Sequence, residues 1–219
     1  MIGLFDSGLG GLATLSHLIK AGCDHRFCYI ADTRHAPYGR RDALSLIALA
    51  EKWSRKLITM GADRIVVACN TMSLAALPYL RRTLSVPVYG VTPPQVEGAL
   101  VLGTAFTARK IEGAKALPRL ATLIDRDYPK LDRIEEYLQE ELKGIRADVV
   151  VLGCTHYAWV KDLISAILHA KTVIDPSLLL AESLPQATKG KGVSVDIVAT
   201  GEDDPKRYAD LLRQAVGEG

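Results

Sequence analysis

Two stretches of the chain are near copies of each other, and each leads into a cysteine. Residues 62–71 read Ala-Asp-Arg-Ile-Val-Val-Ala-Cys-Asn-Thr, and residues 147–156 read Ala-Asp-Val-Val-Val-Leu-Gly-Cys-Thr-His. An apolar run of this length between turn residues is typical of a buried strand in a parallel sheet. Each cysteine would lie just past the carboxyl end of its strand, where open α/β sheets bind ligands. The repeat therefore predicts two similar halves, each bringing one thiol to a shared ligand.

The rest of the chain alternates between strand and helix patterns. Further strands are predicted from short apolar runs at residues 2–5, 27–31, 86–91, 99–102, 172–174 and 195–198. Such alternation favours an α/β fold of parallel sheets covered by helices, with a cleft between the two halves. We expect residues 1-91 plus 178-219 to form the first domain and residues 92-177 the second. The last strand and helix are assigned to the first domain because its sheet would otherwise have an exposed edge.

Composition narrows the possible partners and the compartment. The chain has 219 residues and a formal net charge of +2, without the clustered Lys and Arg of a nucleic-acid or membrane-surface binder. No apolar run approaches the roughly 18 residues of a membrane span. The first residues lack the basic and apolar regions of a secretory signal. We therefore expect a cytoplasmic protein with no nucleic-acid or membrane partner.

The four cysteines separate into two kinds. A disulfide framework is not expected in a chain of this length and compartment. Cys23 and Cys28 are interpreted as small apolar core residues, and their surroundings do not supply four ligands for a metal. Cys69 and Cys154 occupy equivalent positions in the repeat and are followed at once by polar residues, which favours a catalytic use of both.

The chemistry expected of the two repeat cysteines is proton transfer. A thiol at the N-terminus of a helix is near unpaired backbone N–H groups, which favour the thiolate, and only the thiolate is a competent base. Two such groups facing one carbon from opposite sides can remove a proton and return it to the other face. His156 lies two residues after Cys154 and is a candidate proton partner for it. Asp6, in a Gly-rich turn after the first strand, is either a helix cap or a carboxylate that serves a neighbouring base or an ammonium group.

The chain also resembles the glutamate racemase family, within the aspartate/glutamate racemase superfamily. The matching segments, in chain order, are Asp6-Ser7-Gly8-Leu9-Gly10-Gly11, Asp32 with Pro37-Tyr38-Gly39, Ala68-Cys69-Asn70-Thr71, Pro87-Val88-Tyr89-Gly90-Val91, Leu152-Gly153-Cys154-Thr155-His156-Tyr157 and Thr200-Gly201. They span nearly the whole chain in the order that the family shows. The family's fold has two α/β halves related by a pseudo-two-fold axis, with the active site in the cleft between them.

This resemblance implies a cofactor-independent racemase, without a metal, that interconverts L- and D-glutamate and supplies D-glutamate for peptidoglycan, cell-wall biogenesis and cell shape. By position, Cys69 would be the acid/base for D-glutamate and Cys154 the one for L-glutamate, assisted by Asp6 and His156 respectively. The resemblance also implies a homodimer and a set of substrate contacts. These contacts are Ser7, Pro37, Tyr38, Gly39, Asn70, Thr71, Thr104, Thr107 and Thr155.

Departures from the family pattern gather in the second half. The chain is short between Thr107 and Asp148, and residues 109–127 show no clear secondary-structure pattern. The usual glutamate ahead of the second cysteine is replaced by Asp125, which is one methylene shorter and leaves its reach to His156 undecided. Ala158 stands where the family has proline, and Thr92 where it has another acidic or polar residue.

Those departures leave other functions open. One is a racemase or isomerase of the same superfamily that acts on another small acidic substrate. Another is a weakly active regulatory binder, which the retained pair of thiols disfavours because a binder does not need them. A cysteine-dependent phosphatase or thiol oxidoreductase is disfavoured too, because neither Cys-x5-Arg nor Cys-x-x-Cys begins at Cys69 or Cys154.

Overall fold

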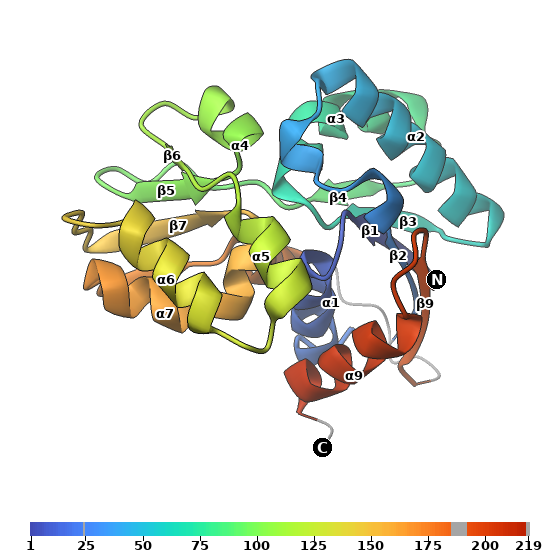
Figure 1. Cartoon of the computed structure of the whole chain (residues 1–219). Helices are drawn as coiled ribbons and strands as arrows, with labels where there is room; N and C mark the ends of the chain where they lie inside the picture. The colour runs from blue at the N-terminus through green and yellow to red at the C-terminus, as the bar shows by residue number, and fades with distance from the viewer. Residues whose placement is uncertain (24, 185–191, 218–219) are drawn as a thin grey trace.

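The chain folds into two halves, each built on a parallel sheet (Figure 1). The structure, a computed structural model, describes residues 1–23, 25–184 and 192–217. Strand order is β4-β3-β1-β2-β9 in the first sheet and β6-β5-β7-β8 in the second, and the strand pairs of both are parallel. The predicted α/β fold of two similar parallel-sheet halves is confirmed.

The elements alternate as the sequence indicated. The first sheet contains β1 (Ile2–Asp6), β2 (Arg26–Ala31), β3 (Arg64–Val67), β4 (Val88–Gly90) and β9 (Ser194–Ala199). The second contains β5 (Leu100–Gly103), β6 (Lys115–Ala116), β7 (Val149–Gly153) and β8 (Thr172–Ile174). The helices are α1 (Gly10–Lys20), α2 (Ala43–Thr59), α3 (Asn70–Thr83), α4 (Ala105–Lys110), α5 (Leu120–Asp127), α6 (Asp132–Glu141), α7 (Lys161–Leu168), α8 (Pro176–Ser183) and α9 (Pro205–Val216). Short 3-10 turns are η1 (Thr33–His35), η2 (Tyr38–Arg40) and η3 (Thr155–Val160). Among these described segments, no helix combines the length and the apolar character needed to cross a membrane.

The last strand returns to the first sheet. β9 pairs with β2 from Arg26 opposite Ser194 to Ala31 opposite Ala199, and α9 packs against α1 (Figure 1). The bounds of the two domains, 1-91 plus 178-219 and 92-177, stay a prediction. α8 lies where that division is least sharp, because it packs on α1 of the first half and also contacts β7 of the second.

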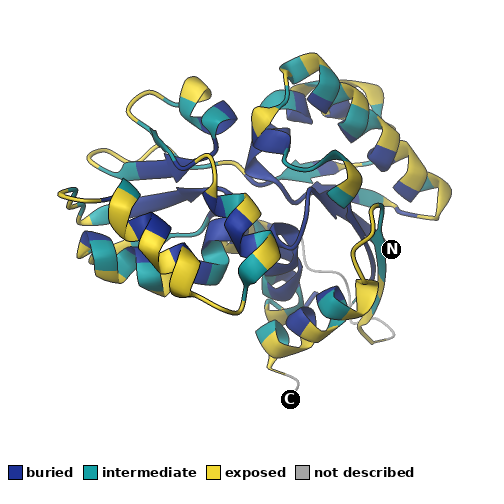
Figure 2. Cartoon of the chain, in the orientation of Figure 1, coloured by how far each residue is buried: buried dark blue, intermediate teal, exposed yellow. Residues whose placement is uncertain are grey.

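The two halves share part of their hydrophobic core. One cluster, with Phe5, Trp53 and Met72 among its members, lies mainly in the first half and also takes in Phe106 of α4. The other is continuous across both halves, because Leu12 and Leu15 of α1 belong to the same buried cluster as Leu123 of α5 and Tyr157 of η3. Figure 2 shows α1 as a largely buried helix between the halves. This shared core holds the carboxyl ends of the two sheets close together.

Cys23 lies in the shared cluster and Cys28 in the other, so both are core residues, as interpreted from the sequence. Their exposed fractions are 1% and 0%. Burial raises the pKa of both thiols, so they stay protonated at neutral pH. They are inert packing residues, in contrast to the two cysteines of the repeat.

Candidate active site

Cys69 and Cys154 line one cavity between the two halves. Cys69 follows β3 and precedes α3, with φ −143° and ψ 122°. Cys154 follows β7 and precedes η3, with φ −150° and ψ 130°. Each is 6% exposed. The repeat therefore places two thiols in equivalent backbone settings, one on each side of a shared space.

Most of the predicted contact residues reach this cavity. Besides the two cysteines, the predicted residues that line it are Ser7, Pro37, Tyr38, Gly39, Thr71, Thr104 and His156. The predicted residues absent from the lining are Asp6, Asn70, Thr107 and Thr155. Asp125, whose reach the sequence left undecided, also lines it, and the lining residues that the sequence did not single out are Arg40, Ala105, Leu117, Pro118 and Ala121. The cavity volume is about 30 Å³, room for little more than one or two water molecules, so the lining must move outward to admit a larger ligand.

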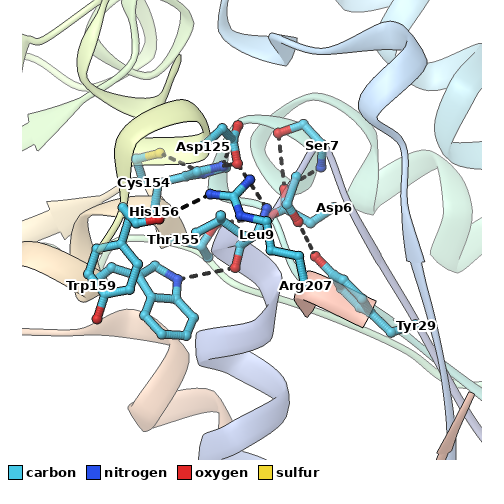
Figure 3. A network of polar contacts seen from close by, with 12 residues as sticks. Asp6, Ser7, Leu9, Tyr29, Asp125, Cys154, Thr155, His156, Trp159 and Arg207 are labelled. Atoms are coloured by element: carbon cyan, nitrogen blue, oxygen red, sulfur yellow. Dashed lines mark hydrogen bonds and ion pairs between the residues drawn. The ribbon is translucent and has the colours of Figure 1, made fainter. Parts of the chain in front are cut away.

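Asp6 supports the cavity from the Cys69 side. Its carboxylate accepts a hydrogen bond from the backbone N–H of Ser7 at 2.7 Å and from the Thr155 hydroxyl at 3.2 Å (Figure 3). Burial raises the pKa of Asp6, and the Cys69 side chain forms a hydrogen bond with it. A carboxyl group with a raised pKa beside a thiol is well placed to exchange a proton with it. Thr155 thus contacts a carboxylate of the other half rather than the cavity.

The expected preference of Cys69 for the thiolate is wrong for this structure. Burial, followed by the Asp6 carboxylate, raises the pKa of Cys69 well above its usual range. The backbone N–H of Met72 in the first turn of α3 acts in the predicted direction and lowers this pKa, but burial outweighs it. Cys69 is therefore a protonated thiol in this closed arrangement.

His156 supports the cavity from the Cys154 side. Its Nδ1 lies 3.7 Å from Cys154 Sγ, and its Nε2 lies 3.0 Å from both carboxylate oxygens of Asp125 (Figure 3). Burial opposes the imidazolium, but the charge of Asp125 and the hydrogen bonds outweigh burial and raise the pKa of His156 well above its usual range. His156 therefore places a positive charge and a ring nitrogen beside the Cys154 sulfur.

Asp125 reaches His156 because the Gly-rich turn leaves room for it. A Cβ added at Gly8 would lie 2.4 Å from Asp125 Oδ1, and one added at Gly10 would lie 2.4 Å from His156 Nδ1. The backbone N–H of Leu9 donates to Asp125 Oδ1 at 3.0 Å. The close approach of α5 to this turn makes up for the shorter side chain, so the contact that the sequence left undecided is present.

The threonines form a chain of hydroxyls across the two halves. Thr71 Oγ1 lies 2.9 Å from Thr104 Oγ1, which lies 3.2 Å from Thr107 Oγ1. Thr107 in turn donates to the carbonyl of Gly153 at 3.3 Å. Thr71 and Thr104 line the cavity, whereas Thr107 is fully buried outside the lining and positions the backbone just ahead of Cys154.

Asn70 presents a polar group that the described residues leave without a partner. Its side chain is 1% exposed, and neither amide atom has a hydrogen-bond partner in the described part of the chain. A buried polar group without a partner costs roughly 1–3 kcal/mol, which favours a ligand that completes it. Across the described residues there is also no group of three or more His, Cys, Asp or Glu placed to hold a metal ion.

Asp32 fixes the loop that carries Tyr38 and Gly39, a role that sequence reasoning missed. Its fully buried carboxylate accepts hydrogen bonds from four side chains, at 2.7 Å from Tyr38, 2.7 Å from His35, 2.8 Å from Trp53 and 2.8 Å from Thr200. Burial opposes ionisation, but these hydrogen bonds outweigh it and lower the pKa of Asp32. The buried carboxylate therefore joins η1, η2, α2 and the end of β9.

Replacing Asp32 with alanine is expected to lower the free energy of unfolding by about 3 kcal/mol or more, because several buried donors lose their acceptor. Urea denaturation at neutral pH measures this. Since the pKa is lowered in the folded state, the contribution of Asp32 is present above its usual value of 3.8 and is lost as the pH falls towards the folded pKa. The matched control is Asp42→Ala, which removes one exposed cap on α2 and should cost only about 1 kcal/mol. Equal losses in the two variants would contradict the role assigned to Asp32.

Comparison with known proteins agrees with this geometry. No family model matches the chain. A glutamate racemase of Thermus thermophilus is 34% identical over 243 residues, covering 99% of this chain and 92% of the relative. The glutamate racemase of Aquifex aeolicus is 33% identical over 244 residues, covering 99% and 94%. The crystal structure of glutamate racemase from Thermus thermophilus in complex with β-chloro-D-alanine matches with a TM-score of 0.83 at 31% identity, over 99% of this chain and 93% of that chain.

The fold of two parallel-sheet halves and the similarity to these proteins in sequence and structure define a racemase, which is a kind of isomerase. The chain belongs to the glutamate racemase family. The resemblance stated from the sequence motifs is thereby confirmed.

Proposed function

We propose that this protein interconverts L- and D-glutamate by moving the α-proton between two thiols. The observation that carries the proposal is that Cys69 and Cys154, one from each half, line the same small cavity. Family membership supports glutamate as the small-molecule substrate. On this proposal the protein supplies D-glutamate for peptidoglycan in the cytoplasm and acts as a homodimer without a cofactor.

Each direction of the reaction uses both sulfur atoms. With D-glutamate, the Cys69 thiolate takes the proton from Cα, and the Cys154 thiol gives its proton to the opposite face, which leaves L-glutamate and a Cys154 thiolate. With L-glutamate the roles reverse. Asp6 receives the proton that Cys69 must lose before D-glutamate reacts, and His156, 3.7 Å from Cys154 Sγ, is the proton partner of Cys154 when L-glutamate reacts.

The surroundings of the thiols support charge development at Cα. The α-proton beside a carboxylate is very weakly acidic, so the carbanionic transition state needs fixed donors around it. Thr71 and Thr104 line the cavity, and the Asn70 amide next to Cys69 has donor capacity that no described residue uses. We assign these groups to holding the substrate's polar groups. A small cavity that excludes water strengthens such interactions.

The test is optical and isotopic. Circular dichroism of L-glutamate and of D-glutamate incubated with purified protein should decay to the same racemic end point. In D2O, proton NMR should show loss of the α-proton signal from both enantiomers. L-aspartate serves as the control substrate and should react far more slowly. Unchanged dichroism together with an intact α-proton signal would overturn the proposal, and faster turnover of aspartate would point to another acidic substrate.

A further inference from the structure

Arg40 supplies a positive charge at the cavity and takes no part in the proposed proton transfers. Among the residues that line the cavity it is the one lysine or arginine. It is an exposed residue at the end of η2, directly after the Tyr38-Gly39 pair. Its guanidinium forms no ion pair or hydrogen bond with any side chain in the described ranges. Since arginine pairs well with carboxylates, an arginine at this position has free capacity for an anionic ligand.

The backbone beneath Arg40 is held on both sides. The Tyr38 hydroxyl donates to the buried Asp32 carboxylate at 2.7 Å, and Arg41 Nε donates to the carbonyl of His35 at 2.6 Å. A Cβ added at Gly39 would lie 2.6 Å from Thr104 Cβ, so η2 packs directly against the start of α4 in the other half. Arg40 therefore projects from a fixed turn at the rim where the halves meet.

The charges around the cavity show what Arg40 can recognise. The other two charged residues that line it, His156 and Asp125, form an ion pair at 3.0 Å, so their charges offset each other. A bound amino acid with an acidic side chain brings two carboxylates and one ammonium next to a site that also forms a thiolate. Arg40 is the cation left to balance the second carboxylate. A neutral side chain of the same length would gain much less from it.

We propose that Arg40 is a specificity-determining residue that binds the side-chain carboxylate of the substrate and selects glutamate over neutral amino acids of similar size. The inference rests on the proposed function, since it assigns one of the two carboxylates of that substrate. Arg40 sits at the rim and not at the thiols, so its contact acts equally on bound substrate and transition state.

The experiment compares Arg40→Gln with the wild-type protein. The KM for L-glutamate and the Kd for D-glutamate, from ligand-observed NMR, should rise about tenfold or more, as expected for loss of a charge-assisted hydrogen bond. The kcat should stay within about twofold, because the lost contact binds the substrate and the transition state equally strongly. The inhibition constant of D-glutamine should stay within about twofold. The matched control is Arg34→Gln, which removes an exposed arginine of the same loop that does not line the cavity, and should leave all four constants unchanged.

Other outcomes separate this inference from the proposed function. Unchanged glutamate binding in Arg40→Gln, or equal weakening of glutamate and glutamine, would overturn the role of Arg40. If Arg34→Gln weakens glutamate binding as much as Arg40→Gln does, the effect comes from the general positive charge of the loop, and the specific role of Arg40 is overturned. Glutamate binding that depends on Arg40 without any inversion would support the carboxylate contact while the racemase proposal fails. A wild-type protein that binds no glutamate would overturn both.

Discussion

Serine in place of either Cys69 or Cys154 is expected to lower the kcat for glutamate racemisation by about 10³-fold or more, in both directions. Every turnover needs one sulfur as base and the other as acid, so the loss of either blocks both directions. A serine hydroxyl is far less acidic than a thiol and is a poor replacement in either role. Circular dichroism measures the rate from each enantiomer. Cys28→Ala, which changes a thiol buried in the core, is the control and should racemise within a few-fold of the wild-type rate.

Isotope exchange distinguishes a lost base from a distorted site. Cys154→Ser keeps Cys69 and should still exchange the α-proton of D-glutamate with solvent deuterium, without inversion. Cys69→Ser should do the same for L-glutamate alone. Exchange of the same enantiomer by both variants would contradict the assignment of one thiol to each face, and wild-type racemisation by either variant would contradict the two-thiol proposal.

The placement of the two thiols could be predicted because it depends on a local pattern. An apolar run followed by a small residue and a cysteine defines a strand and its carboxyl end, and parallel strands place their carboxyl ends at one edge. The repetition of that pattern then implies two edges that meet. The structure brings Cys69 and Cys154 to one cavity in almost the same backbone conformation.

The region around α5 could not be predicted, for a different physical reason. β6 has only two residues, and α5 only eight, too short for periodicity to stand out. The spacing of Leu120, Leu123 and Ile124 was the one available signal for a helix. Nothing local in the sequence says how near that helix comes to Gly8, so the reach of Asp125 depended on packing between the halves.

The pKa of Cys69 was mispredicted because helix polarity was weighed without burial. The sequence indicates a helix N-terminus after the cysteine, and the Met72 N–H does lower the pKa. It does not indicate that the thiol lies in a cavity of about 30 Å³ next to the buried Asp6. In such a setting the loss of water costs the thiolate more than one backbone dipole returns.

Replacing Asp125 with asparagine is expected to lower the kcat from L-glutamate by about 10²-fold, the usual size of a lost acid–base partner. Asp125 holds the pKa of His156 well above its usual range against the effect of burial. Without the carboxylate, burial dominates and His156 becomes neutral near pH 7, so the Cys154 thiolate loses its adjacent positive charge. The loss should be largest at pH 8 and should shrink towards pH 6, where His156 can again take a proton. Dichroism-based rates across that range measure it, with Asp127→Asn, which changes a carboxylate outside the cavity lining, as the control.

The same ion pair makes the stability of the protein depend on pH with a defined sign. The folded-state pKa of His156 is raised, so the stabilisation from its pairing with Asp125 is fully present below the usual histidine value of 6.5 and declines as the pH rises through the folded pKa. The difference in unfolding free energy between the wild-type protein and Asp125→Asn should therefore be larger at pH 6 than at pH 10. A difference independent of pH would mean that Asp125 acts through its hydrogen bond to the Leu9 N–H and not through the charge of His156. The Leu9 N–H belongs to the first half and Asp125 to the second, so a pH-independent difference would assign Asp125 to holding the two halves together. A pH-dependent difference, together with the pH profile of kcat, would assign it to keeping His156 charged beside Cys154.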